Sequence, residues 1–191
     1  LPLPEPAQKP LAVQINNEPV ARPHTNLQYA VIVYEAPTES AVTRFTAFFA
    51  THLPDDIGPI RSVRVAALEV IPAHDGILVY SGASIDMTEA LFVSGVPALH
   101  AEGNAASGSR REPSRLAPHN LYVSGPRMYD IARELGFAGP SEAPSFTFGA
   151  LPDHGLVSSG VTIPFTSGKV DFTYNPTLLR YERSVDDEPH L

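Results

Sequence analysis

Short apolar runs separated by turn residues dominate the first part of the chain. Residues 11–15 (LAVQI) predict a first strand, and Asn16 and Asn17 follow as a turn. Residues 29–36 (YAVIVYEA) form a continuous run rich in β-branched side chains, which is typical of a buried central strand. Residues 42–50 (VTRFTAFFA) alternate and predict the second arm of a hairpin.

A further apolar run at 76–81 (GILVYS) also predicts a buried strand. Sheet centres are built from such runs, so we expect residues 30–35 and 76–81 to be neighbouring strands of one sheet. Between the hairpin and this strand, VRVAALEVI predicts a short helix that Pro72 stops.

Two later helices are predicted from their end signals. Asp86 and Glu89 form a possible capping box for a helix over residues 87–94, and Gly95 ends it. The segment SGPRMYDIARELG carries every helix signal. These signals are a cap at Ser124, Pro126 in the first turn, a stripe of Met128, Ile131, Ala132 and Leu135, and a closing Gly136.

The last quarter of the chain turns to a β pattern, with SFTFGAL, VTIPF, KVDFTY and LLRYER from residue 144 onward. Short helices between early strands, followed by a run of strands, indicate an α+β fold. We expect a mixed β-sheet with short flanking helices and a β-rich C-terminal part. Residues 1–10 read as a Pro-rich linker without regular structure, and residues 11–191 as a single α+β domain.

Composition narrows the class of protein. The 191 residues are 43% hydrophobic and 18% charged, which excludes a disordered chain. The formal net charge of −8 argues against general nucleic-acid binding, which normally needs a basic face. The absence of cysteine excludes disulfides, a thiolate nucleophile and a Cys zinc site. No run approaches the roughly 18 apolar residues of a membrane helix. The Pro-rich opening and the abrupt end suggest a processed piece of a longer protein.

Glu35 is the first candidate for chemistry, because it ends an apolar run and should be partly buried. A buried carboxylate must be paired or protonated. It either pairs with an arginine such as Arg44 or Arg61 to hold loops together, or acts as a general acid or base.

The segment GPIRSVR supplies the second candidate, with Arg61, Ser62 and Arg64. If the turn leads straight into the helix, the two arginines share one face at its N-terminus and form an anion site. The alternative is a solvated pair, or pairing with Asp55 and Asp56.

The third candidate lies in the long loop AEGNAASGSRREPSRLAP and the residues that follow it. His119 and Asn120 could orient a substrate or move protons, or could form a structural hydrogen-bond hub. We expect Glu35, at least one of Arg44, Arg61 and Arg64, and the His119–Asn120 pair to lie together.

None of the usual sequence motifs of enzymes occurs in the chain. There is no G-x-S-x-G, G-x-x-x-x-G-K-[ST], G-x-G-x-x-G or H-E-x-x-H. The seven histidines have no diagnostic ligand spacing, so we expect neither a metal nor a cofactor. Whether the protein is an enzyme stays open.

The order of motifs resembles the bacterial DUF3048 family of YerB-like lipoproteins, through its N-terminal domain. The matching pieces are LAVQINN, ARP at 21–23, IVYEAPTESAVTRF, IGPIRSVR, the strand after His74-Asp75, RREPSRLAPHNLY and VDFTYNPTLLRYERSVDDEPH. The resemblance implies a secreted, lipid-anchored envelope protein with an α+β fold and supplies no activity. It makes these motif positions the candidate ligand-binding residues: Arg22, Glu35, Thr43, Arg44, Arg61, Ser62, Arg64, Arg111, Arg115, His119 and Asn120.

The chain departs from the family pattern in two places. Asn16 stands where an aspartate is expected, and Ser40 and Ala41 replace glycines. The family usually continues into a second, C-terminal domain.

Three hypotheses for function follow. The first is an envelope-associated binding protein with an Arg-rich cleft for an anionic component, such as a peptidoglycan stem carboxylate or a phosphate polymer. The second is an accessory lipoprotein that docks on a membrane-complex protein. The third is an envelope hydrolase or transferase using Glu35 and His119. The membrane would be reached only through an N-terminal lipid anchor, and nucleic acid is not an expected partner.

Overall fold

The chain forms two compact units in the computed structural model. The structure describes residues 8–39, 42–144, 146, 158–166 and 168–190. The larger unit comprises Leu1–Thr38 and Thr43–Pro144, and the smaller unit comprises Glu39–Val42 and Ser145–Leu191. The mixture of sheets and helices confirms the α+β class, while the single domain over residues 11–191 stays a prediction.

A mixed five-stranded sheet organises the larger unit. Its strands are β1 (Leu11–Asn16), β2 (Ile32–Pro37), β3 (Thr43–Phe49), β4 (Ile77–Tyr80) and β5 (Ala98–His100). The strand order is β2-β3-β1-β4-β5. β1 runs antiparallel to β3 and parallel to β4, which is itself parallel to β5. The carboxyl ends of β1, β4 and β5 therefore lie at the same edge of the sheet.

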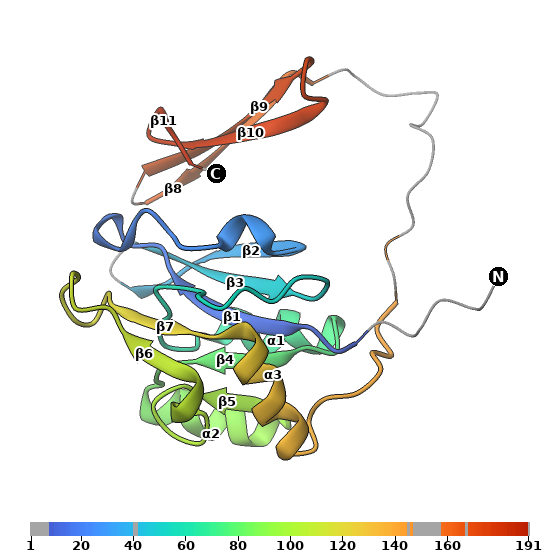
Figure 1. The fold of residues 1–191 in the computed structure, drawn as a ribbon. Helices are drawn as coiled ribbons and strands as arrows, with labels where there is room; N and C mark the ends of the chain where they lie inside the picture. The colour runs from blue at the N-terminus through green and yellow to red at the C-terminus, as the bar shows by residue number, and fades with distance from the viewer. Residues whose placement is uncertain (1–7, 40–41, 145, 147–157, 167, 191) are drawn as a thin grey trace. The chain divides into compact units, whose positions relative to one another are not determined.

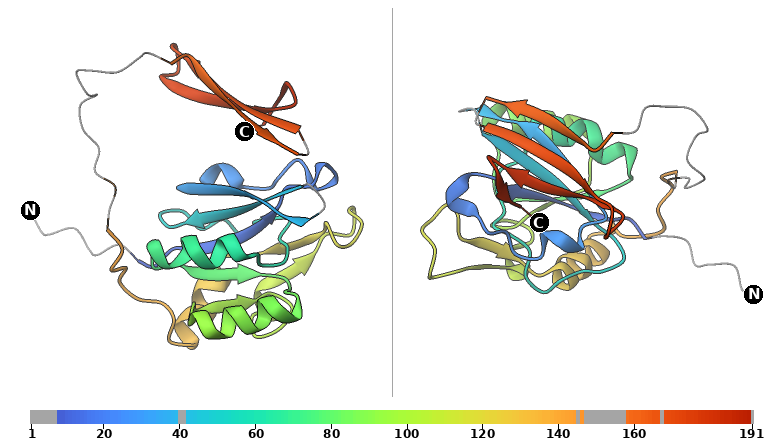
Figure 2. Two further views of the ribbon diagram at one scale, coloured as in Figure 1. Left: turned by 180° about the vertical axis from the view of Figure 1, so that it is seen from behind. Right: turned by 90° about the horizontal axis from the view of Figure 1, so that it is seen from above.

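Helices cover both faces of this sheet. They are α1 (Val65–Ala73), α2 (Ile85–Ser94) and α3 (Gly125–Glu134). Figures 1 and 2 show α1 and α2 on one face and α3 on the other. Alternation along β1 divides the core accordingly, because Leu11 and Val13 pack in the cluster that holds Met128, while Ala12 packs with Ile71.

The strand prediction for 76–81 is confirmed, because Ile77, Leu78 and Val79 are fully buried in β4. The expectation that residues 30–35 lie beside it is wrong. β2 is an edge strand, and β3 and β1 lie between it and β4. Val33 remains 43% exposed. β3 is an interior strand that contributes Phe48 to the core on one side of the sheet and Phe45 and Phe49 to the core on the other, and its hairpin partner β2 is left at the edge.

Helix ends follow the sequence signals in part. α3 is confirmed, with the Ser124 hydroxyl accepting the Arg127 N–H, although Leu135 is 44% exposed. α2 begins at Ile85 and is capped by Ser84, whose hydroxyl accepts the Met87 N–H at 3.3 Å. The predicted Asp86–Glu89 capping box is therefore wrong, because a serine with extended backbone already precedes the first turn.

Gly95 ends α2 in the left-handed region at φ +68°, as predicted. α1 runs one residue past Pro72, which lies in the last turn of that helix. A proline there removes one N–H donor without blocking the turns before it.

A short antiparallel ribbon occupies part of the loop predicted over residues 101–118. Its strands are β6 (Ser109–Arg111) and β7 (Leu121–Val123). Arg111 pairs with Leu121 in the register, so residues 112–120 form the loop of a hairpin. Residues 106–108 form one 3₁₀ turn before β6.

The smaller unit is a four-stranded antiparallel sheet in the order β11-β10-β9-β8. Its strands are β8 (Gly160–Phe165), β9 (Gly168–Asn175), β10 (Arg180–Val185) and β11 (Glu188–Pro189). They confirm the β pattern of VTIPF, KVDFTY and the RYER part of LLRYER, whose Leu178 and Leu179 lie in the turn before β10. Most of SFTFGAL lies outside the described residues. The strand register places most of the apolar side chains on one face of this sheet, which also carries Arg183. The apolar residues of this face are Val161, Ile163, Phe165, Val170, Phe172, Tyr174, Tyr181 and Val185.

The predicted linker is only partly described, because residues 1–7 lie outside the described residues. Gln8 makes an isolated bridge with Pro140, and Lys9 and Pro10 belong to no helix or strand.

Candidate functional site

The carboxyl end of β1 is lined by residues 57–61, which belong to no helix or named strand. The Asn16 N–H donates to the Pro59 carbonyl, and the Arg61 N–H donates to the Gln14 carbonyl, both at 2.9 Å. On its other side the same segment bonds to β7, where the Ile60 N–H donates to the Leu121 carbonyl at 2.8 Å. Residues 57–61 therefore lie between β1 and β7 and carry Arg61 to the end of β1.

Three consecutive residues at this end, Asn16, Asn17 and Glu18, bind side chains from five other segments. The contacts are Asn16–His119, Asn17–Arg22, Asn17–Glu35, Asn17–Thr43 and Glu18–Arg61. We call these eight residues the β1-end cluster. Five of the eleven predicted site residues belong to it. The carboxyl ends of strands are the usual place for ligands in open sheets that contain parallel strands.

Glu35 is held by neutral donors. Its Oε1 accepts from the Asn17 amide at 3.0 Å and from the Thr43 hydroxyl at 2.7 Å. The hairpin register explains the contact with Thr43, because Glu35 pairs with Phe45 and Thr43 lies two residues before it on the same face. Asn17 and Thr43 are 2% and 5% exposed, so these bonds replace water that the half-buried carboxylate has lost.

Arg61 pairs with Glu18, with its Nη2 at 3.2 Å from Oε1. Both side chains are 26% exposed. α1 begins only at Val65 and Arg64 has extended backbone, so the turn does not lead straight into the helix. Arg61 and Arg64 consequently do not share a helix face.

Arg44 and Arg64 bind backbone carbonyls beside the cluster. Arg44 is 5% exposed and donates to the Ser62 carbonyl at 2.8 Å. It lies opposite Asn16 in the sheet register. Arg64 donates to the carbonyl of Val63 at 2.9 Å.

Arg115 clamps the segment that carries Arg22. Its Nη1 and Nη2 donate to the carbonyls of Ala21 and Pro23, at 2.8 and 2.9 Å. Arg22 itself donates from Nε to Asn17 Oδ1 at 3.2 Å and from Nη2 to the Asn17 carbonyl at 3.0 Å. The long loop and the segment around Arg22 are thus fixed to each other and to β1.

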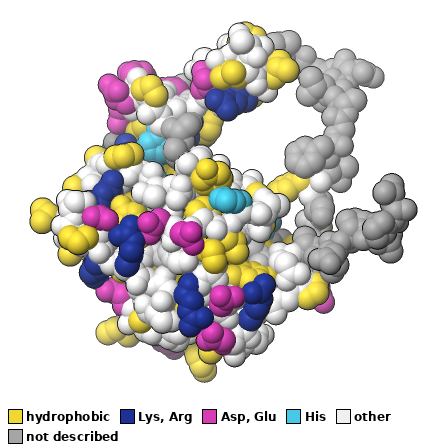
Figure 3. Space-filling model, viewed as in Figure 1, with side chains coloured by type: hydrophobic (Ala, Val, Ile, Leu, Met, Phe, Trp, Pro, Cys, Tyr) yellow, Lys and Arg dark blue, Asp and Glu magenta, His cyan; other side chains and the backbone are white. Residues whose placement is uncertain are grey.

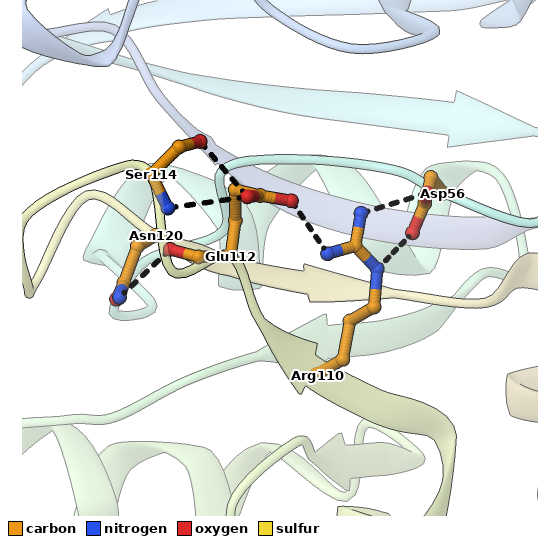
Figure 4. Close-up of polar contacts among 5 residues, drawn as sticks. All are labelled: Asp56, Arg110, Glu112, Ser114 and Asn120. Carbon is orange, nitrogen blue, oxygen red and sulfur yellow. Dashed lines mark hydrogen bonds and ion pairs between the residues drawn. The ribbon is translucent and has the colours of Figure 1, made fainter.

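The remaining predicted residues, Arg111 and Asn120, bind each other at the base of the ribbon. Arg111 Nη1 donates to Asn120 Oδ1 at 2.7 Å, and Nη2 pairs with Glu102. The Asn120 amide donates in turn to the Glu112 carbonyl at 3.4 Å (Figure 4). This pair holds the base of the loop and places His119, the preceding residue, beside Asn16.

Arg110 is fully engaged by acidic groups. It bonds to both carboxylate oxygens of Asp56 at 2.8 Å and to Glu112 at 2.9 Å (Figure 4). The Arg110 guanidinium, together with the Ser114 hydroxyl and N–H, lowers the pKa of Glu112 to about 2. Figure 3 shows arginine and acidic side chains side by side on the viewed face of the molecule. Arg110 is therefore a structural ion pair, and Asp56 pairs with it and not with Arg61.

The described residues contain no group of three or more His, Asp or Glu side chains that could hold a metal ion. An open depression of about 520 Å³ on the smaller unit is lined by residues such as Lys169, Asp171 and Asp187. None of the predicted site residues lines it.

Asn16, Asn17 and Glu18 are members of the cluster that residue patterns alone do not single out. The sequence predicts a turn at Asn16 and Asn17, yet Asn16 ends β1 and both are almost fully buried, at 0% and 2% exposure. The available signal was their position directly after a buried strand, where polar side chains of neighbouring loops gather. His24, whose Nε2 lies 2.7 Å from the Asn16 carbonyl, was also missed.

The fold and the cluster together define a class: an α+β protein whose buried polar network closes the carboxyl end of a central strand. The chain belongs to the DUF3048 family, because residues 2–138 match the model described as "Protein of unknown function (DUF3048) N-terminal domain". The match covers most of the larger unit, including the whole β1-end cluster.

A named relative is the "Putative lipoprotein YerB" of Bacillus subtilis (strain 168), 32% identical over 130 residues. The alignment covers 68% of this chain and 39% of the relative, so the matched part spans well under half of that protein's length. The crystal structure of YerB from Bacillus subtilis is similar at a TM-score of 0.80 and 26% identity, over 97% of this chain and 63% of that one.

The relationship to a protein named as a lipoprotein suggests a location at the cell envelope. In the part of the chain that the structure describes, no helix is long and apolar enough to cross a membrane.

Proposed function

We propose that this protein is an extracytoplasmic, envelope-associated binding module, and that the β1-end cluster takes an anionic group of an envelope component. One observation carries the proposal: side chains from five separate segments converge on Asn16, Asn17 and Glu18. A fold that needed only to close a strand end would not require two arginines and a histidine there. Arginine forks suit carboxylates and phosphates.

The surroundings of the cluster add to its positive charge. Arg115 binds two backbone carbonyls and forms no ion pair within the described parts of the chain. Arg44 lies opposite Asn16 in the register. Together with Arg22 and Arg61 they give four positive charges in this region, against the two negative charges of Glu18 and Glu35. The chain as a whole has a formal net charge of −8. Local positive charge in an acidic protein favours an anionic ligand over a cationic one.

The proposed ligand is a carboxylate or phosphate of the envelope, such as a peptidoglycan stem carboxylate or a phosphate polymer. The protein would be held at the membrane by an N-terminal lipid anchor, in keeping with a relative that is named as a lipoprotein. Nucleic acid is not a proposed partner.

Arg61 is the residue whose removal tests this function. In Arg61→Gln, inorganic phosphate and N-acetyl-D-alanine should each bind at least about tenfold more weakly, because one charge-assisted hydrogen bond is lost. The measurement is the dissociation constant from ¹H–¹⁵N chemical-shift titration, followed at the backbone amides of Asn17, Glu18 and His119.

Arg127→Gln is the matched control, because Arg127 bonds to Glu134 and Ser107 on and beside α3. It removes the same charge and should leave both dissociation constants unchanged. Equal weakening in the two variants, or no shifts at the cluster amides in the unsubstituted protein, would contradict the proposed function.

A second candidate function, docking on a membrane-complex protein, is favoured by the apolar face of the smaller unit's sheet. Val161 and Tyr181 on that face are 53% and 49% exposed. Exposed apolar area of this kind is common at protein interfaces. The third hypothesis, a hydrolase or transferase using Glu35 and His119, draws less support, because these side chains bond to different asparagines of the cluster.

A further inference from the structure

The side-chain amide of Asn16 has a fixed orientation. Asn16 is fully buried, and its Oδ1 accepts the Glu18 N–H at 3.2 Å. The opposite orientation would place the amide NH₂ against that N–H, so that two donors faced each other without an acceptor. The Asn16 Nδ2 must therefore point to His119, whose Nδ1 lies 2.8 Å away.

This orientation determines where His119 carries its proton. The Asn16 NH₂ can only donate, so the Nδ1 of His119 must accept with its lone pair. In a neutral imidazole with an unprotonated Nδ1, the proton is on Nε2. The other neutral tautomer would bring the Nδ1–H against the Asn16 NH₂ and leave a buried donor unsatisfied. That cost disfavours it by at least about tenfold in population.

The backbone holds His119 in place for this role. Its N–H donates to the Leu116 carbonyl at 2.9 Å, which closes a turn inside the loop. The next residue, Asn120, is 8% exposed and bonded to Arg111, and its carbonyl accepts the Glu112 N–H at 2.7 Å. The His119 ring therefore extends from the loop of residues 112–120, whose two ends are fixed to β6 and β7.

We infer that Asn16 holds His119 as an Nε2–H donor, so that the β1-end cluster presents an N–H and no imidazole lone pair to its ligand. His119 is partly exposed, and no group among the described residues accepts from its Nε2. A ligand atom at this edge must be an acceptor, which selects carboxylate and phosphate oxygens and rejects ammonium and other pure donors. The inference rests on the proposed function and makes Asn16 a positioning residue.

The direct test is the tautomer of His119 in the full chain at about pH 8, where an ordinary imidazole is neutral. Long-range ¹H–¹⁵N correlation of the ring distinguishes the two tautomers, and His119→Gln assigns the signals. We expect the Nε2–H form to exceed the Nδ1–H form by at least about tenfold. A majority of the Nδ1–H form, or an even mixture, would overturn the inference without any variant.

Asn16→Asp tests the cause. A carboxylate at this position can only accept, so the ratio should reverse in favour of the Nδ1–H tautomer. Asn104→Asp is the matched control, because it adds the same charge at an exposed loop asparagine that bonds to backbone groups of His100 and Ala98. It should leave the His119 ratio unchanged. An unaltered ratio in folded Asn16→Asp would show that Asn16 does not set the tautomer.

The ligand arm separates this inference from the proposed function. Inorganic phosphate should shift the Nε2 resonance of His119 in the unsubstituted protein, whereas methylammonium chloride should not. A confirmed tautomer with no phosphate shift anywhere in the cluster would refute the proposed binding function. A phosphate shift at the cluster together with a His119 that is mainly Nδ1–H would refute only the inference.

Discussion

Replacing Gly58 with alanine is expected to destabilise the larger unit by about 3 kcal/mol. A Cβ at this position would lie 2.8 Å from Tyr122 Cδ1 and 2.9 Å from the Leu121 carbonyl oxygen. The tyrosine ring could move, but the carbonyl belongs to the backbone of β7 and accepts the Ile60 N–H. Relief of the clash would therefore separate residues 57–60 from β7, at the place where this segment carries Arg61 to the end of β1.

The measurement is denaturant unfolding followed by circular dichroism at 222 nm. Every α-helix of the described residues belongs to the larger unit, so this signal reports on it. Gly139→Ala is the control, because no atom lies within 4 Å of the Cβ that it would add. It should change the free energy of unfolding by less than about 0.5 kcal/mol. Equal stability of Gly58→Ala and Gly139→Ala would show that the segment is not packed against β7 as described.

Asn17→Ala is also expected to lower the free energy of unfolding by about 3 kcal/mol. The Asn17 side chain donates to Glu35 and Thr43 and accepts from Arg22 Nε. Its removal leaves these buried or half-buried groups short of partners without exposing them to water, which is the costly way to break a polar network. The same unfolding experiment measures the loss.

Gln28→Ala is the matched control for removing an amide side chain, since Gln28 is exposed. It should be close to neutral. If Asn17→Ala were as stable as Gln28→Ala, Asn17 would not hold Glu35, Thr43 and Arg22 together. The β1-end cluster would then be an accidental set of neighbours.

Local sequence signals predicted β1, β3, β4 and the helix α3 well, but gave no strand over β5 (Ala98–His100). β1, β3 and β4 coincide with mainly apolar runs, and such side chains are buried regardless of which strands pair with them. The position of β2 could not be predicted in this way. Its run looks central, and only the pairing of β3 with β1, across residues far apart in sequence, leaves it at the edge.

The role of the candidate residues as a site stays a prediction, and the structure shows only which of them lie together. Glu35, Arg61 and His119 do reach one region, because they bond to the consecutive residues Asn17, Glu18 and Asn16. Their partners were not predictable. Arg61 pairs with Glu18 and not with Glu35, and Arg111 bonds to Glu102 and Asn120 at the base of the ribbon. Such choices depend on side-chain geometry across loops, which residue spacing does not encode.

The central claim is that the β1-end cluster binds an oxyanion, and the location of a bound anion tests it most directly. Selenate is a tetrahedral oxyanion that can stand in for phosphate. Its selenium can be located by anomalous scattering. In crystals of the protein equilibrated with selenate, we predict a selenium peak that places an oxygen within hydrogen-bond distance of both His119 Nε2 and the Arg61 guanidinium. Selenate bound only at other sites, with the β1-end cluster open to solvent and without a peak, would contradict the account.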